Sequence, residues 1–260
     1  MEEIRILLGE TVFSFRSEIL LGLGGSLAQF QSPGARPHYQ IHVRYARPGE
    51  PTPHRDGFAS ICREGCRFEL ALSDRWPEPS VWQMLSMLPL SALLLEHGTM
   101  LLHASYILHN GEAIVFCGPS GIGKSTQAEL WRRCRNARIL NGDRILLTPK
   151  DGHVLVHSHY LSGTSGICEN LTAKLRALVL LGQAEHNRAY PPEPLDAFRR
   201  ILGQADYDPR NRDQMIRITA LAETLLAQAR ICCLDCTPEE SAVNCLEKYL
   251  YEEFRNPNHS

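Results

Sequence analysis

The chain has little net charge and no long uninterrupted apolar segment. Its 27 basic and 29 acidic side chains give a formal net charge of −2, which excludes a broad electrostatic attraction to nucleic acid or to an anionic membrane surface. The most apolar stretch, residues 84–102, is broken by Pro89 and Glu96, whereas a membrane-spanning helix needs about 20 mainly apolar residues. We therefore expect no nucleic-acid partner and no membrane partner.

The sequence also lacks the signs of a secreted or zinc-binding protein. Residues 1–3 are acidic where a secretory signal peptide would be basic, so we expect a cytoplasmic protein. The nine cysteines are an odd number, and no C-x-x-C pair recurs at the spacing of a zinc finger. Cys117 and Cys233 fall in strongly apolar runs, which is typical of free thiols that act as small hydrophobic residues.

Alternating side chains predict a β-hairpin in the first part of the chain. Apolar and polar residues alternate along residues 66–72, so this segment should bury one face as the second arm, after a first arm at residues 58–62. Residues 31–56 hold five prolines and few apolar side chains, and they predict a mostly exposed connection. We divide the chain into a β-rich N-terminal region, residues 1–80, and a larger domain, residues 81–260.

The larger domain contains a complete phosphate-binding loop. Residues 118–126 read Gly-Pro-Ser-Gly-Ile-Gly-Lys-Ser-Thr, which satisfies the pattern G-x-x-x-x-G-K-[ST], between the strand-like residues 113–117 and a helical pattern. The alternative, that this is an ordinary glycine-rich turn, would not require all the defining positions. We expect a bound nucleotide to contact Gly118, Pro119, Ser120, Gly121, Ile122, Gly123, Lys124, Ser125 and Thr126.

Each residue type in the loop has a physical role. Glycine permits backbone angles at which successive N–H groups turn inward and surround phosphate oxygens at a helix N-terminus. Lys124 would neutralise the β- and γ-phosphates, and the Ser125 hydroxyl would bind Mg²⁺, a hard cation that prefers oxygen ligands. The expected cofactors are therefore ATP and Mg²⁺.

Hairpins on both sides of the loop predict a mixed sheet. Residues 101–108 and 113–117 are strand-like and are joined through Asn110-Gly111, a strong signal for a tight hairpin turn. After the helix, residues 138–140 and 145–147 predict further strands that lead to a turn at residues 150–152. Common phosphate-loop proteins alternate strand and helix in a parallel sheet, so the pattern indicates a less common nucleotide-binding fold.

The same segments carry a family resemblance. They are Leu102-His103-Ala104-Ser105, Asn110-Gly111, the phosphate-binding loop and Leu140-Asn141-Gly142-Asp143-Arg144. Together they resemble the catalytic core of HPr kinase/phosphorylase and its shorter HPr-kinase-like relatives, which often stand beside enzymes that build modified peptides. The resemblance covers roughly residues 101–170. It implies an α/β (α+β) fold related to ATP-dependent phosphoenolpyruvate carboxykinase, with a mixed, largely antiparallel sheet around the P-loop and a smaller N-terminal β-rich region.

The resemblance also implies roles for individual residues. It makes Lys124, Asp143 and His103 the catalytic group, with Asp143 orienting or deprotonating the acceptor hydroxyl. In the alternative assignment, Asp143 holds the metal and His103 assists the acceptor. The implied metal ligands are Ser125, Asp143 and, by a weaker similarity, Glu169. Plain structural interpretations also stand: a turn capped by the Asp143 side chain itself, a core histidine at position 103, and an ordinary turn before Glu169.

The function that follows is an ATP-dependent kinase that passes the γ-phosphoryl group to a hydroxyl, with serine of a peptide or small protein as the favoured acceptor. Residues 1–80 would help to recognise that substrate or another partner. Two alternatives remain: a nucleotide-binding regulatory or scaffold protein with degraded catalysis, and a small-metabolite kinase or carboxykinase-like enzyme. A homo-oligomer is compatible with the sequence.

Overall fold

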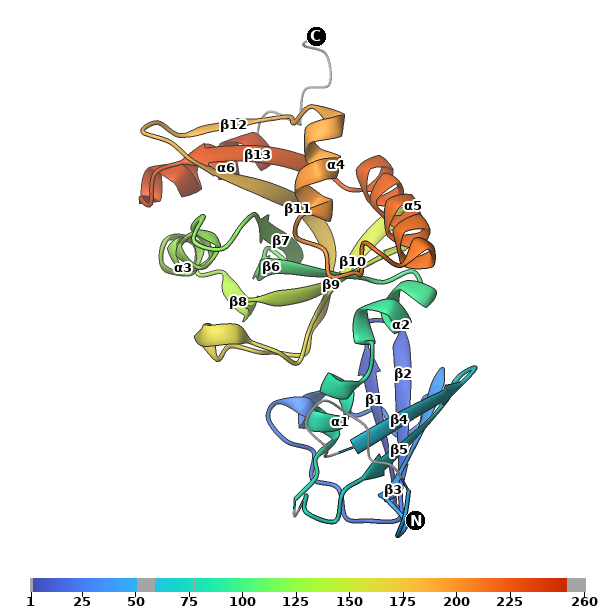
Figure 1. The fold of residues 1–260 in the computed structure, drawn as a ribbon. Helices are drawn as coiled ribbons and strands as arrows, with labels where there is room; N and C mark the ends of the chain where they lie inside the picture. Colours follow the sequence, from blue (N-terminus) through green and yellow to red (C-terminus); the bar gives the residue numbers. More distant parts are fainter. Residues whose placement is uncertain (1, 51–58, 77, 252–260) are drawn as a thin grey trace. The chain divides into compact units, whose positions relative to one another are not determined.

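The computed structural model describes residues 2–50, 59–76 and 78–251. The chain divides into two compact units, Met1–Leu90 and Ser91–Ser260. Each unit is built on its own β-sheet, and six α-helices accompany the sheets in the described part of the chain (Figure 1). The protein is thus a mixed α/β protein with two sheets. None of the helices in the described ranges combines the length and the apolar character that crossing a bilayer requires.

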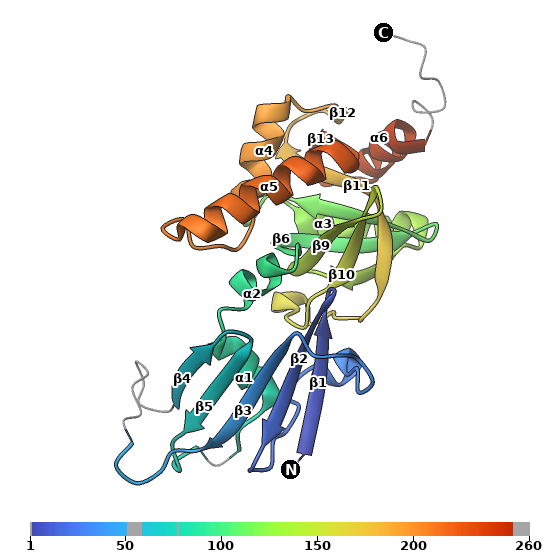
Figure 2. The ribbon, with the colours of Figure 1, turned by 90° about the vertical axis from the view of Figure 1, so that its right-hand side faces the viewer.

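The first unit is a five-stranded sheet in the order β1-β2-β3-β5-β4 (Figure 2). The strands are β1 (Glu2–Leu8), β2 (Thr11–Ser17), β3 (Tyr39–Tyr45), β4 (Ala59–Glu64) and β5 (Arg67–Leu72). The short helices η1 (Leu27–Phe30) and α1 (Val81–Met87) accompany this sheet. Helix α1 begins at a capping box, in which Ser80 and Gln83 each accept a hydrogen bond from the other's backbone N–H.

The predicted hairpin is confirmed, because β4 and β5 pair antiparallel and the alternate side chains Phe68, Leu70 and Leu72 are buried. Its predicted first residue, Phe58, lies outside the described residues. The expectation that residues 31–56 form a mostly exposed connection is wrong for residues 39–45. These residues form β3, which lies between β2 and β5 and runs parallel to both. The prolines on either side of residues 39–45 led to the wrong prediction, because the strands that pair with this central strand are distant in sequence.

The second unit is an eight-stranded mixed sheet in the order β10-β9-β6-β7-β11-β13-β12, with β8 paired to β6 and an additional pairing of β10 with β11. Its strands are β6 (Met100–His109), β7 (Glu112–Cys117), β8 (Arg138–Asn141), β9 (Arg144–Lys150), β10 (His153–Ser158), β11 (Thr172–Gln183), β12 (Arg188–Tyr190) and β13 (Ile231–Cys236). Only β7–β11 and β11–β13 pair in parallel among these strands. The expected mixed, largely antiparallel sheet is confirmed.

The hairpin before the loop also forms as predicted. Strands β6 and β7 pair antiparallel, and the turn between them places Asn110 and Gly111 at φ of 51° and 79°. Two successive positive φ values are what a tight hairpin turn requires, and Asn-Gly tolerates them best. The turn therefore fixes the register in which β7 enters the loop.

Helices cover both faces of the second sheet (Figure 1). One face carries α3 (Lys124–Arg135) and α6 (Glu240–Tyr251), and the other carries α4 (Pro194–Leu202) and α5 (Arg212–Gln228). In β7, Ile114 and Phe116 join the first core while Val115 and Cys117 join the second. A strand buried on both faces needs this continuous apolar run, which explains the run before the loop. Helix α2 (Leu90–Glu96) precedes β6.

Candidate active site

The loop between β7 and α3 has the backbone that its glycines predict. Gly118, Gly121 and Gly123 have φ values of 155°, 80° and 111°, and residues with side chains rarely adopt such angles. Because β7 is parallel to its neighbour β11, the loop lies at the carboxyl edge of the parallel strands, where open α/β sheets bind ligands. Helix α3 starts directly after Gly123, so its N-terminal N–H groups face the loop.

Lys124 folds back over the loop that precedes it. Its side-chain Nζ donates hydrogen bonds to the carbonyl oxygens of Gly118 (2.9 Å) and Pro119 (3.2 Å), and the residue is only 7% exposed. Burial lowers the pKa of the Lys124 ammonium, an effect opposed by Cys117 and Asp143. An ammonium has three N–H groups, and within the described residues two of them have these partners. The third can donate to a phosphate oxygen.

The other polar residues of the loop face solvent. Ser120, Ser125 and Thr126 are exposed, and Ser125 is the second residue of α3. An exposed hydroxyl in the first turn of this helix can reach an ion that also touches the phosphates held by the loop. The metal role of Ser125 stays a prediction, and Thr126 is one of the residues that line a second cleft.

The turn that carries Asp143 is held by Asn141, not by Asp143. The Asn141 Oδ1 accepts hydrogen bonds from the backbone N–H groups of Asp143 (3.0 Å) and Arg144 (3.1 Å). Its Nδ2 donates to the carbonyls of His159 (2.6 Å) and Leu161 (3.0 Å). Asn141 is fully buried. Because Asn141 caps the turn, the Asp143 carboxylate is left for other contacts, which argues against a purely structural aspartate.

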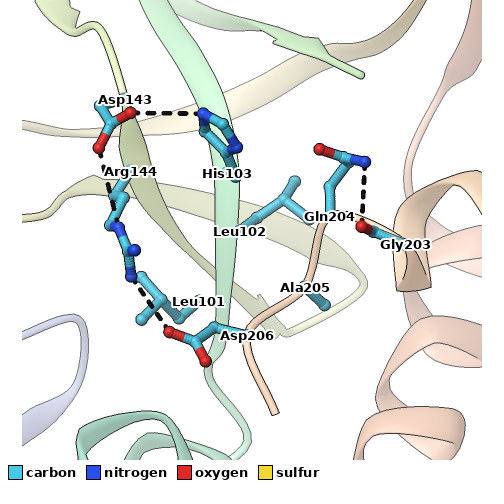
Figure 3. Close-up of a pocket in the computed structure, with 9 residues that line it drawn as sticks. All are labelled: Leu101, Leu102, His103, Asp143, Arg144, Gly203, Gln204, Ala205 and Asp206. Carbon is cyan, nitrogen blue, oxygen red and sulfur yellow. Dashed lines mark hydrogen bonds and ion pairs between the residues drawn. The ribbon is translucent and has the colours of Figure 1, made fainter. Parts of the chain in front are cut away.

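The Asp143 carboxylate points at His103, which lies on the neighbouring strand β6 (Figure 3). The Asp143 Oδ1 lies 3.3 Å from His103 Nε2, and its Oδ2 lies 3.8 Å from Arg144 Nε. Arg144 continues the chain of charges through its Nη1, which lies 3.1 Å from an Asp206 carboxylate oxygen. The residues come from β6, the β8–β9 turn, β9 and the segment after α4. Three separate pieces of sequence thus meet in one polar row, which consists of His103, Asp143, Arg144 and Asp206.

The surroundings of the histidine in this row disfavour its protonated form. Burial lowers the pKa of His103, and the positive charge of Lys124 lowers it further, while Asp143 acts in the opposite direction. A neutral imidazole with its proton on Nε2 donates that proton's hydrogen bond to Asp143. The charges of Lys124 and Asp143 both act on the pKa of His103, so the three side chains lie near one another, and their catalytic role stays a prediction.

A cavity of about 290 Å³ opens beside these residues. His103, Asp143 and Arg144 line one side, and Gly203 to Asp206, which follow α4, line the other (Figure 3). The backbone N–H of His103 donates to the Gln204 carbonyl (2.9 Å), so the two walls are joined. The volume suits a single side chain or a small metabolite, not a large ligand.

A glycine brings a further loop against Asp143. A Cβ added at Gly163 would lie 2.7 Å from both Cβ and Cγ of Asp143, and its φ is +56°. A Cβ added at Gly142 would lie 2.5 Å from the Ser165 Oγ. The short helix η2 (Gly163–Ser165) is therefore packed directly on the Asp143 turn, and position 142 has no room for a side chain.

Glu169 is not drawn into this row. The Glu169 carboxylate pairs with Arg138 at the start of β8, and the Glu169 backbone N–H donates to the Leu140 carbonyl (2.9 Å). Asp143 follows the other end of β8. Among the described residues, no group of three or more His, Cys, Asp or Glu side chains could hold a metal ion. The metal role of Glu169 stays a prediction, as does that of Ser125 and Asp143.

Sequence reasoning missed two members of the row. Arg144 directly follows Asp143 in the motif that carries the resemblance, so its position was a usable signal. No sequence signal pointed to Asp206, because it lies 62 residues further along the chain from Arg144. The nine cysteines are free thiols, as predicted.

Comparisons with known proteins add little to this geometry. No family model matches the chain, and no curated protein matches it. Among the matching solved structures is the HPr(Ser) kinase/phosphatase from Coxiella burnetii, with 14% identity and a TM-score of 0.26, over 47% of this chain and 88% of the other. This similarity indicates at most a distant structural relationship, so the function must be derived from the residues themselves.

Proposed function

We propose that the protein is an ATP-dependent phosphotransferase of the HPr-kinase-like type, which transfers the γ-phosphoryl group of ATP to a hydroxyl. One observation carries the proposal: a glycine loop with a buried lysine at the carboxyl edge of parallel strands adjoins the His103–Asp143 pair. Either feature alone has ordinary structural explanations. Their proximity supports phosphoryl transfer, which requires donor and acceptor groups to be aligned.

The donor set suits ATP with Mg²⁺. A Cβ at Gly121 or Gly123 would meet nothing within 4 Å, so open space borders the loop where phosphate oxygens could approach its N–H groups. Ser125 and, in the alternative assignment, Asp143 offer hard oxygen ligands of the kind Mg²⁺ prefers. When bound, the metal would neutralise charge on the transferred phosphoryl group.

Asp143, Lys124 and His103 then have distinct tasks in the transfer. The acceptor hydroxyl lies in the 290 Å³ cavity and gives its proton to the Asp143 carboxylate as its oxygen bonds to the γ-phosphorus. The bond from that phosphorus to the β,γ-bridging oxygen breaks, and ADP leaves with the electron pair. Lys124 stabilises the charge on the phosphoryl oxygens. His103, whose Nε2 lies 3.3 Å from the Asp143 Oδ1, keeps the carboxylate oriented.

The favoured acceptor is a serine of a peptide or small protein, because the cavity accommodates one side chain. The N-terminal unit would recognise the rest of that substrate, and we place the protein in the cytoplasm. A small-metabolite kinase would use the same cavity without the N-terminal unit.

One observation favours a second function, a nucleotide-binding regulatory protein without turnover. The packing of Gly142 against Ser165 leaves the turn with Asp143 as its single carboxylate. A site that needs separate carboxylates for metal and acceptor would therefore be incomplete. This alternative predicts ATP binding with no transfer to any peptide.

Two measurements test the proposal. Mg-ATP at about a hundred times its Kd should stabilise the wild type by about 2.7 kcal/mol, and Lys124→Ala should lose most of that gain. If ATP shifts neither protein, the nucleotide site is disproved. Labelled ATP and candidate peptides should then give transfer in the wild type and a loss of at least about 100-fold in Asp143→Asn. Undiminished transfer by that variant would remove Asp143 from the reaction.

A further inference from the structure

A second cleft, of about 400 Å³, is lined in part by the phosphate-binding loop. Its walls are the second half of the loop, Thr126 and Gln127 in the first turn of α3, and the residues that end β11 and β13. It shares no lining residue with the cavity at His103. The two hollows are therefore separate: the loop lines the second, and His103 and Asp143 line the first.

The position of the cleft follows from the parallel strands. β7, β11 and β13 are neighbours that run in the same direction, so their carboxyl ends meet at one edge. Gln183 at the end of β11 is paired in register with Cys236 at the end of β13. A ligand whose phosphates occupy the loop after β7 can extend along this edge into the cleft.

Gln127 gives the cleft an unused hydrogen-bond acceptor. The residue is 2% exposed, and its Nε2 donates to the Cys236 sulfur at 3.2 Å. Its Oε1 is buried and has no hydrogen-bond partner among the described residues. Buried polar atoms are nearly always satisfied, so an unpartnered acceptor on a residue that lines the cleft points to a ligand that donates to it.

The lining of the cleft mixes apolar and polar groups and carries no ionised side chain. Gln183 and Thr237 contribute an amide and a hydroxyl, and burial raises the pKa of the Cys236 thiol to about 11, so that it remains neutral. The Gln183 Nε2 donates to the Gly121 carbonyl at 3.3 Å, which joins this wall to the loop. A neutral wall beside an anion-binding loop suits the uncharged part of a nucleotide.

We propose that this cleft binds the nucleoside of the phosphoryl donor, and that Gln127 selects adenine by accepting a hydrogen bond from its exocyclic amino group. The assignment rests on the proposed function, since it needs a nucleotide whose phosphates lie in the loop. Guanine presents a carbonyl oxygen where adenine presents that amino group. Two acceptors would then face each other, so the cleft discriminates against GTP.

The test distinguishes the contribution of the nucleoside to binding affinity from that of the phosphates. Calorimetry with Mg²⁺ measures the affinities of ATP, purine riboside triphosphate, which lacks the amino group, and inorganic tripolyphosphate. Wild type should bind ATP at least tenfold more tightly than either of the others. Gln127→Leu should lower that preference over purine riboside triphosphate to within twofold and leave tripolyphosphate affinity within twofold of wild type. Gln228→Leu, on the exposed end of α5, is the matched control and should behave as wild type.

Several outcomes would overturn the assignment. Equal wild-type affinities for ATP and purine riboside triphosphate would refute the role of the amino group, and this comparison needs no variant to fold. A loss of tripolyphosphate affinity in Gln127→Leu equal to its loss of ATP affinity would show damage to the loop instead of a nucleoside contact. Failure of wild type to bind both ATP and tripolyphosphate would reject the proposed function as well, whereas tight tripolyphosphate binding without a preference for ATP would reject the cleft alone.

Discussion

Replacing Asn141 with alanine should disrupt the Asp143 turn and leave the phosphate-binding loop intact. The substitution removes four hydrogen bonds from a fully buried side chain, two that it donates and two that it accepts. Each such bond contributes about 0.5–1.5 kcal/mol net, and two of the groups left behind are carbonyls in the interior, so the loss should be about 3 kcal/mol. For a domain of this size, that lowers Tm by roughly 6–12 °C.

The assay has a stability arm and a functional arm. Thermal unfolding of Asn141→Ala should show the lower Tm, while Mg-ATP below the transition should still bind, because the loop at residues 118–123 makes none of these contacts. Transfer to an acceptor should fall by at least about tenfold, since Asp143 loses its fixed position. Asn244→Ala, which removes one hydrogen bond from an exposed residue, should change Tm by little. A Tm loss in Asn141→Ala as small as in this control would refute the reasoning.

Three further predictions concern Asp143, a buried histidine and the metal. Gly163→Ala would place a Cβ 2.7 Å from Asp143 at a positive φ, so kinetics should show transfer falling while the ATP Kd changes less than about twofold; normal transfer would contradict the close packing. Burial lowers the pKa of His159 to about 3. Below about pH 6.5 the His159 imidazole therefore binds a proton in the unfolded chain but not in the folded chain. Stability should therefore fall by about 2 kcal/mol from about pH 7 to pH 5 on this account. Urea unfolding should show a flatter pH dependence in His159→Gln, and an unchanged slope would assign the effect to other groups. Ser125→Ala should raise the Mg²⁺ concentration needed for half-maximal transfer by at least about fivefold, and an unaltered Mg²⁺ titration would exclude the hydroxyl as a ligand.

Local sequence patterns were sufficient for the elements around the loop. The Asn110-Gly111 turn, the apolar run of β7 and the glycine spacing each act over a few residues, where steric limits on φ are strong. Their consequences, a hairpin, a doubly buried strand and a loop with positive φ values, are all present. Strand β3 shows the opposite case, since its pairing partners on both sides were invisible to a local pattern.

The residues that make the site specific came from contacts over long sequence separations. Asp206 joins Arg144 across 62 residues, and Gln127 meets Cys236 across 109. No periodicity or motif links such positions, because the chain between them contributes only to how the elements pack. The same holds for Asn141, whose role in capping the Asp143 turn depends on the carbonyls of His159 and Leu161.

The amino-acid sequence by itself determined the loop at residues 118–126 and the strand and helix on either side of it, because these follow from steric and hydrogen-bonding rules that operate within short segments. Asp143 and His103 became candidate partners only through the family resemblance of the motifs around them. Only the tertiary structure decided that Asn141 caps the turn and leaves the Asp143 carboxylate to face His103, and that Gln127 offers an acceptor to a neutral cleft. Those features arise when strands distant in sequence pair in one sheet, which brings together side chains that no local rule relates.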